Sequence, residues 1–392
     1  MPRQSCYHNL ELPQELGFLL PDKYWGRPQK NLDPGESACL EETTLVLLGT
    51  SQPRPAHLAD RPFADGDCMN CHILYHDNCF DGACSAAVFM RFYLSRIDSG
   101  ASFRLFGMAH QPRQTFPDHL FQGDENAIVD FKYASHERLT WWFDHHYSAF
   151  LTPEDEAHFR SRNNNRMFHD PDYKSCTKLI ATIGHRLFGF DAGVLEDLIY
   201  WADIVDGALY ANAQTAVEVG EPAQKLAAVI EANKDTAFSH SIIHQLSKQP
   251  LNHVATQADV LDRYRPLHQS HSENIRIIRE ASQCRRGVTF FDLIPFGLEG
   301  YNKFIPYHLH PECDYHVSLM QSPQRTKVSV GSNPWSPNQR RHNLARICER
   351  YGGGGHPVVA AISFPPDQPE KARQAAREIV AELQKATIHK HH

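Results

Sequence analysis

An alternation of short apolar runs with amphipathic stretches begins at Cys71 and constrains the fold more than any other feature of the chain. Short, mostly apolar runs indicate buried strands, and apolar residues spaced three and four apart indicate helices. Strands that alternate with helices form a parallel sheet with helices on both faces. We therefore predict an α/β fold with a mainly parallel sheet flanked by helices. The predicted strands are 71–76, 103–109, 127–131 and 140–144, and the predicted helices are about 82–96, 174–188, 194–209 and 223–233.

A second region of alternating strands and helices is predicted beyond Arg286. Apolar residues between Val254 and Ile278 recur on one helical face, which predicts a long helix between the two regions. The predicted strands of the second region lie near 287–294, 315–320, 326–330 and 358–363, and its helices at 339–351 and 367–385. The predicted segments are an N-terminal extension (1–70), a first domain (71–250), a helical linker (251–285) and a smaller α/β C-terminal domain (286–392).

Composition limits the class of protein further. At 392 residues the chain is long enough for two domains with their own cores. It has no apolar run that could span a membrane and no signal-peptide pattern at its start, so we expect a cytoplasmic protein with free thiols and no membrane partner. The net charge of −7 argues against a surface that grips long duplex nucleic acid. It does not exclude a small phosphorylated substrate, because a metal site carries its own positive charge.

Acidic and histidine residues follow three of the predicted strands and recur on the helix at 194–209. Because ligands bind outside the carboxyl ends of parallel strands, we expect these side chains to converge. Converging carboxylates repel one another unless cations lie between them, and mixed carboxylate and imidazole ligands suit manganese. Two such ions could clamp a phosphoryl group and activate a water molecule. The candidate residues are His76, Asp77, Cys79, Asp81, Asp130, Asp144, His145, His146, Asp203 and Asp206.

Four of these segments resemble the successive motifs of the DHH phosphoesterase superfamily. The motifs read YHDNCFDG at 75–82, IVDF at 128–131, FDHHYS at 143–148 and WADIVDG at 201–207. Far downstream, the GGGGH run at 352–356 resembles the glycine-rich signature of the DHH-associated C-terminal domain. The resemblance covers roughly residues 71 to 365 and points to the branch of oligoribonucleases and phosphoadenosine phosphatases. It implies an active site in the cleft between two domains and a divalent metal cofactor, most often one or two manganese ions.

The resemblance also implies roles for individual residues. Asp81, Asp130 and His145 would be metal ligands, with Asp130 as the bridge between two ions. Asp144 would orient His145, and His146 would face the phosphate of the substrate.

The fourth-motif acid matches Asp203, with Asp206 as the rival assignment. His76 and Asp77 are further candidates near the metals. Substrate contacts are predicted at the start of the first helix, in a basic helix and in the glycine run. They are Ser85, Arg340, Arg341, Gly353, Gly354, Gly355 and His356.

Two positions depart from the pattern of the family. Cys79 stands where an acid is usual, so it could bind as a thiolate that favours softer metals such as zinc. Alternatively, His76 or Asp77 supplies the missing ligand, or only one metal binds. In the C-terminal domain, Gly331 stands where relatives often present an arginine, for which Lys327, Arg340 or Arg341 could compensate.

Cys68, Cys71 and His72 fit the C-x-x-C-H spacing of covalent haem attachment. Because the motif runs directly into a predicted core strand and the chain has no export pattern, we interpret these cysteines as buried thiols rather than as a haem or zinc site.

The favoured hypothesis is hydrolysis of a phosphodiester or phosphomonoester in a small nucleotide or short single-stranded oligonucleotide. A catalytically decayed nucleotide-binding or sensor protein of the same fold is the alternative, motivated by Cys79 and Gly331. Hydrolysis of polyphosphate or pyrophosphate would need a more basic pocket than the sequence reveals. The sequence does not determine the oligomeric state, and a homodimer is one possibility.

Overall fold

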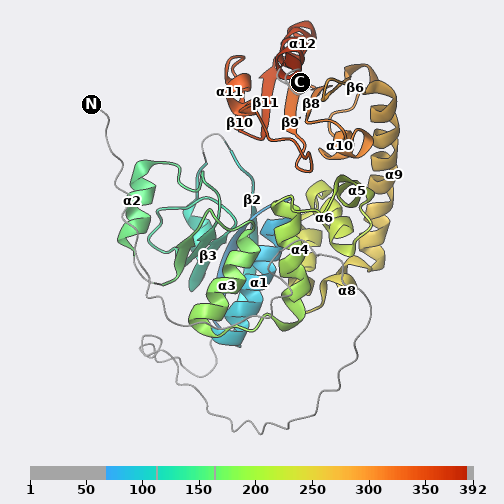
Figure 1. Ribbon diagram of the computed structural model, residues 1–392. Helices are drawn as coiled ribbons and strands as arrows, with labels where there is room; N and C mark the ends of the chain where they lie inside the picture. Colours follow the sequence, from blue (N-terminus) through green and yellow to red (C-terminus); the bar gives the residue numbers. More distant parts are fainter. Residues whose placement is uncertain (1–67, 112–113, 163–164, 386–392) are drawn as a thin grey trace, which may run out of the picture. The chain divides into compact units, whose positions relative to one another are not determined.

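The computed structural model describes residues 68–111, 114–162 and 165–385 (Figure 1). The predicted extension at 1–70, with its strand-like run at Thr43 to Leu48, lies outside the described residues apart from its last three positions. The histidine-rich end of the chain lies outside them as well.

The first sheet has five strands in the order β2-β1-β3-β4-β5, and every neighbouring pair is parallel. The α/β fold with a parallel sheet is therefore confirmed. The registers pair Tyr75 with Val129 and Val129 with Phe143, so that the carboxyl ends of β1, β3 and β4 lie next to one another. The strands are β1 (Asn70–His76), β2 (Ser102–Met108), β3 (Glu125–Val129), β4 (Trp141–Asp144) and β5 (Met167–His169).

Successive strand residues point to opposite sides of the sheet, and in β1, β3 and β4 the residues on both sides are buried. Ile73 and Trp141 pack on the face covered by α1, whereas Leu74 and Trp142 pack on the other face. Helix α1 lies against α3, and its first half is almost wholly buried (Figure 1). The helices of this region are α1 (Phe80–Arg96), α2 (Pro153–Ser161), α3 (Cys176–Phe188), α4 (Glu196–Asp206), α5 (Ala213–Glu218), α6 (Pro222–Ala232), α7 (Thr236–Leu246) and α8 (Leu251–Ala255).

The long helix α9 (Ala258–Ala281) follows, as the apolar spacing predicts, and leads into a second sheet. This sheet has six strands in the order β10-β11-β9-β8-β7-β6, with only β7 and β8 parallel. Ile379 and Leu383 of the last helix are buried in the core on this sheet. Its elements are β6 (Gln283–Arg285), β7 (Val288–Asp292), α10 (Ile305–Leu309), β8 (Tyr315–Gln321), β9 (Thr326–Ser332), α11 (Leu344–Glu349), β10 (Gly354–His356), β11 (Val359–Phe364) and α12 (Pro369–Lys385).

Several short elements escaped prediction because they have too few residues for a periodic pattern. Strands β5, β6 and β10 have three residues each, and α5 has six. The predicted helix at 339–351 shortens to α11, because the side chain of Asn343 accepts a hydrogen bond from Arg346 N–H and starts the helix there. No helix in the described ranges is long and apolar enough to cross a membrane.

Candidate metal centre

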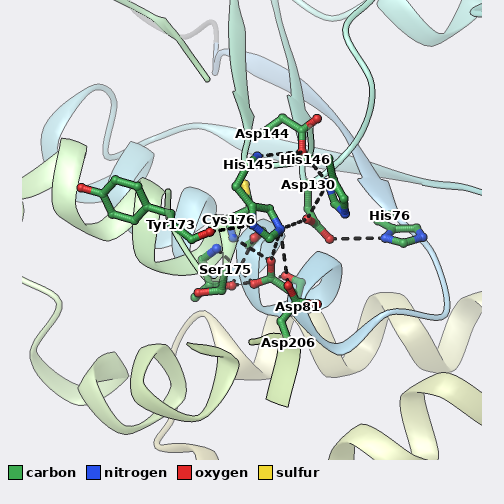
Figure 2. A network of polar contacts seen from close by, with 12 residues as sticks. His76, Asp81, Asp130, Asp144, His145, His146, Tyr173, Ser175, Cys176 and Asp206 are labelled. Carbon is green, nitrogen blue, oxygen red and sulfur yellow. Dashed lines mark hydrogen bonds and ion pairs between the residues drawn. The ribbon is translucent and has the colours of Figure 1, made fainter. Parts of the chain in front are cut away.

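Asp130 lies at the centre of the site, one residue beyond the end of β3 (Figure 2). Its backbone has a φ of +55°, a conformation that Asp tolerates better than most residues, and its N–H donates to the carbonyl of Phe143. The side chain is 1% exposed, and neither carboxylate oxygen has a hydrogen-bond partner among the described residues. A buried carboxylate without hydrogen bonds is costly, so the surroundings of Asp130 call for a cation.

His145 faces Asp130 from the end of β4. Its Nδ1 lies 3.1 Å from the carbonyl oxygen of Tyr173, an acceptor that fixes the proton on Nδ1 and leaves the lone pair on Nε2. That Nε2 lies 3.5 Å from Asp130 Oδ1 and 3.5 Å from Asp206 Oδ2. It also lies 3.7 Å from Asp81 Oδ2. This is the arrangement of a histidine that coordinates a metal through Nε2.

Asp81 is held in place by the N-terminus of α3. The N–H of Cys176 donates to Asp81 Oδ2 at 2.7 Å, and the N–H of Thr177 donates to Oδ1 at 3.1 Å. A helix N-terminus stabilises a negative charge without a neighbouring cationic side chain. Asp81 is therefore oriented towards His145 before any ion binds.

His76 and Cys79 approach Asp130 from the other side. His76 Nδ1 lies 3.4 Å from Asp130 Oδ2, and it too lacks a hydrogen-bond partner within the described chain. His76, Cys79 and Asp130 each offer one ligand atom, and these atoms lie within 4.8 Å of one another. The same holds for Asp81, His145 and Asp206, and for Asp130 with His145 and His146. The residues present thus fit divalent cations on both sides of Asp130.

Asp144 supports the pair of histidines that follows it. Its Oδ1 accepts hydrogen bonds from the backbone N–H groups of His145 and His146, and lies 2.7 Å from Nδ1 of His146. The prediction that Asp144 orients the ring of His145 is therefore wrong. Asp144 orients the ring of His146, because the Tyr173 carbonyl already occupies Nδ1 of His145.

Electrostatics within the cluster show what the carboxylates do without a metal. Burial alone would lower the pKa of His145, but the nearby carboxylates of Asp130, Asp81 and Asp206 raise it to about 10. Burial and the charge of Asp130 raise the pKa of Asp81. A proton on His145 thus offsets the acids, and a divalent ion would replace that proton.

The pKa values of three other groups in the cluster are shifted by burial and by neighbouring charges. Burial alone would raise the pKa of Asp130, but the imidazoles of His145 and His76 hold it well below its usual range. Burial, followed by the charges of Asp130 and Asp81, raises the pKa of the Cys79 thiol well above its usual range. Burial alone would lower the pKa of His146, but Asp144 raises it. Without a metal, the raised pKa keeps Cys79 a neutral thiol.

The structure separates the two candidates for the fourth-motif acid. Asp206 joins His145 and Asp81, as described above. Asp203, one helical turn earlier, accepts a hydrogen bond from Ser175 Oγ and forms an ion pair of 2.9 Å with Lys178 Nζ. Asp203 therefore anchors α4 to the start of α3 rather than joining the ligand groups.

Two other predicted site residues lie away from the ligand groups. Ser85 is fully buried in α1, and its hydroxyl lies 3.1 Å from that of Thr177. The predicted substrate contact at Ser85 is contradicted, because the hydroxyl lies between two packed helices. Asp77 turns towards β2, where a Cβ added to Gly107 would lie 2.7 Å from Asp77 Cγ.

The predicted substrate-binding residues of the C-terminal region lie between β9 and α11 or in and just before β10. Arg340 and Arg341 are exposed in the segment before α11. The glycine run leads into β10, which pairs with β11, and His356 at its end is exposed. Gly353 and Gly355 are required sterically, because an added Cβ would lie 2.3 Å from Ala361 O and 2.5 Å from Val359 O.

Gly331 is closed to larger side chains. An added Cβ would lie 2.5 Å from His316 Cε1 and 2.6 Å from the Tyr307 hydroxyl, which is itself 2.7 Å from His316 Nδ1. The arginine of the family pattern therefore has no room at this position unless that buried pair changes as well.

Two residues near the cluster were missed from the sequence. His110 follows β2, stacks on Phe131 at 4.6 Å and has its ring 4.6 Å from that of His76. Partial burial and the nearby rings of His76 and His146 lower the pKa of His110 to about 4. Its place directly after the predicted strand at 103–109 was the available signal.

Lys303 is the second residue that was missed. Burial and Asp130 raise the pKa of Asp206, and the positive charge of Lys303 partly opposes that shift. The adjacent residue Asn302 donates from its side chain to the carbonyl of Ala216, which fixes this segment beside α5. Nothing in the local sequence around Lys303 marks it as a site residue.

No family model matches the chain, and no curated protein matches it either. Among solved structures, a pGpG-specific phosphodiesterase from Vibrio cholerae is similar at 16% identity over 80% of this chain and 99% of that chain, with a TM-score of 0.57. RecJ from Thermus thermophilus in complex with Mn²⁺ is similar at 13% identity over 80% of this chain and 52% of that chain, with a TM-score of 0.47. The similarity to the phosphodiesterase shows that the two chains share a fold.

Proposed function

We propose that this chain, which has the fold of the DHH phosphoesterase superfamily, is a hydrolase that uses divalent metal ions to cleave a phosphoester bond. The observation that carries the proposal is the buried carboxylate of Asp130, whose two oxygens face His76 on one side and His145 on the other. A carboxylate placed in this way can bridge two ions, the arrangement that suits displacement at phosphorus.

The proposed cofactor is manganese on the side of His145. Asp81, Asp206 and His145 offer two carboxylates and one imidazole there, a donor set that suits manganese. When bound, the ions would neutralise charge on the phosphoryl group and lower the pKa of a coordinated water. The protein supplies the positioning, because Asp81 and His145 are held by backbone groups of α3 and of Tyr173.

His146 is proposed as the residue that contacts the substrate phosphate or the leaving group. Its side chain is 36% exposed, in contrast to 9% for His145, so it remains accessible beside the cluster. The hydrogen bond to Asp144 occupies Nδ1 and leaves Nε2 as the nitrogen that would hold or donate a proton. A proton on Nε2 would stabilise the negative charge that develops on the oxygen that leaves.

The proposed substrate is a small nucleotide or a short single-stranded oligonucleotide. Lys303 offers an exposed positive charge near Asp206 that could hold a second phosphate. Arg340, Arg341, the glycines at 353–355 and His356 remain the proposed contacts to the distal part of the substrate. Glycines let a phosphate or a base approach the backbone closely. The N–H of Gly353 already donates to the carbonyl of Cys348, so the proposed N–H contacts come from the glycines that follow it.

The alternative hypothesis is a nucleotide-binding protein that has lost its catalytic activity. One of the two residues that suggested it, Cys79, gives it less support in the structure. Cys79 keeps a ligand atom beside His76 and Asp130, so the exchange of an acid for a thiol does not empty that side of the site. The exchange changes the type of donor instead.

The test is hydrolysis by the metal-stripped full-length chain, with a generic phosphodiester, short RNAs and nucleotides as substrates. We expect turnover when manganese is added and no turnover by Asp130→Asn under the same conditions. Equal activity of Asp130→Asn and the native chain would contradict the proposed centre. Tight nucleotide binding without turnover by any metal-loaded sample would support the binding protein.

A further inference from the structure

We propose that the two sides of the metal centre select different ions: His76, Cys79 and Asp130 bind a thiophilic ion such as zinc, and Asp81, His145 and Asp206 bind manganese. The manganese part of this inference rests on the proposed function, whereas the zinc part does not. It concerns donor chemistry, because a thiolate and a carboxylate carry the same charge and differ in softness.

The loop from His76 to Cys79 is built to bring these two residues to Asp130. An added Cβ at Gly82 would lie 2.1 Å from the carbonyl oxygen of His76, so only glycine lets the first turn of α1 approach the end of β1 so closely. Asn78 has a φ of +54° and donates from its side chain to the carbonyl of Asn233 at 3.0 Å. The turn is therefore held in one conformation before a metal binds.

Cys79 occupies the N-cap position of α1, yet its side chain makes no capping hydrogen bond. Asp, Asn, Ser and Thr are the residues that stabilise a helix at this position, by roughly 1 kcal/mol. A cysteine is not among these preferred residues, so helix capping alone does not account for Cys79.

A metal-binding role for the Cys79 sulfur is supported by two nearby atoms that lack hydrogen-bond partners. His76 Nδ1 and Asp130 Oδ2 lie 3.4 Å apart, and both are buried without a hydrogen bond among the described residues. Cys79 adds a sulfur within 4.8 Å of ligand atoms on both. One imidazole, one thiolate and one carboxylate make three protein ligands, the number typical of a zinc site that keeps a position open.

The other cysteines near the centre differ from Cys79. Cys84 and Cys176 are fully buried in the core beside α1 and α3, and they belong to none of the three groups of ligand atoms. On the manganese side, Asp81, His145 and Asp206 offer only oxygen and nitrogen. The softness of the donors therefore differs across the shared carboxylate of Asp130.

The experiment is a titration of the metal-stripped full-length chain with Co²⁺, followed by the near-ultraviolet charge-transfer absorption of a cobalt–thiolate bond. We expect the band to saturate at one ion per chain and to vanish in Cys79→Ser and Cys79→Asp. Cys68→Ser should keep the band, because Cys68 is exposed, in contrast to the buried thiol expected from the sequence, and belongs to none of the ligand groups. The histidine-rich C-terminal end can bind cobalt too, but imidazole produces no thiolate band.

Metal content supplies the second readout. After equilibration with equal zinc and manganese and removal of free ions, the native chain should hold about one zinc, and Cys79→Asp should exchange most of it for manganese. Folding of each variant is checked by circular dichroism, and Cys79→Asp restores the acid and the N-cap, so it should fold.

The outcomes separate the two proposals. A cobalt–thiolate band from Cys79 without hydrolysis of any substrate would uphold this inference and overturn the proposed function. Manganese-dependent hydrolysis with no such band, and with the same metal content in Cys79→Asp, would overturn this inference alone.

Discussion

Asp130 combines two unfavourable features in one residue. Its φ of +55° lies in a region that side chains other than glycine rarely occupy, and its buried carboxylate has no hydrogen-bond partner among the described residues. Such features each cost on the order of 1–3 kcal/mol and persist where function requires them. Cations bound to the carboxylate, as proposed above, would offset the cost at Asp130.

Asp206 and Asp203 make a direct comparison at the residue scale. We expect Asp206→Asn to reduce activity by roughly 100-fold or more, because even partners outside the ligand shell are worth about 10–100-fold. Manganese affinity should fall in parallel, which isothermal titration would measure. The matched control is Asp197→Asn, an exposed acid in the first turn of the same helix, which should leave both quantities unchanged.

Replacement of Asp203 should affect stability more than metal binding, unlike replacement of Asp206 or of Asp197. Its partners are Ser175 and Lys178, so Asp203→Asn should lower the melting temperature more than the manganese affinity. If Asp203→Asn abolished metal binding while Asp206→Asn did not, the assignment of the fourth-motif acid would have to be reversed.

At the scale of elements, the site depends on where β strands end and where α3 begins. Parallel pairing places the carboxyl ends of β1, β3 and β4 side by side, and two N–H groups at the N-terminus of α3 donate to Asp81. In the second sheet, packing limits the choice of residue on β9. Gly331 contacts the buried pair of Tyr307 and His316, which leaves no space for a side chain.

We expect Gly331→Ala to destabilise the chain by about 1–3 kcal/mol, as added atoms do in a packed core. Urea unfolding would measure the loss. Gly220→Ala is the control, because an added Cβ there would meet no atom within 4 Å. Equal stability of the two variants would show that the Tyr307–His316 pair yields easily and that an arginine could be accommodated on β9.

At the scale of the whole molecule, metal binding and stability are linked. A ligand that binds only the folded state stabilises it by RT ln(1 + [L]/Kd), which is about 2.7 kcal/mol at 100 times Kd. We expect manganese to raise the melting temperature of the metal-stripped chain and a chelator to reverse the change. Asp130→Asn should show little of this shift, whereas a shift equal to that of the native chain would mean that the stabilising ions bind elsewhere.

The sequence by itself determined the parallel α/β fold and the motifs that gather at one edge of the sheet, because strand periodicity and motif order are local properties of the chain. Local patterns could not choose between Asp203 and Asp206, which lie three residues apart on one helix. That choice depends on Lys178 and Ser175, which occupy Asp203, and on His145, which lies beside Asp206. Lys303 became visible only once its distant neighbours were in place, since a side chain's electrostatic partners are set by packing across the fold. His110 follows a predicted strand, but only the fold brings its ring against that of His76. Tertiary structure likewise decided that Ser85 is buried and that a ligand atom of Cys79 lies within 4.8 Å of ligand atoms of His76 and Asp130.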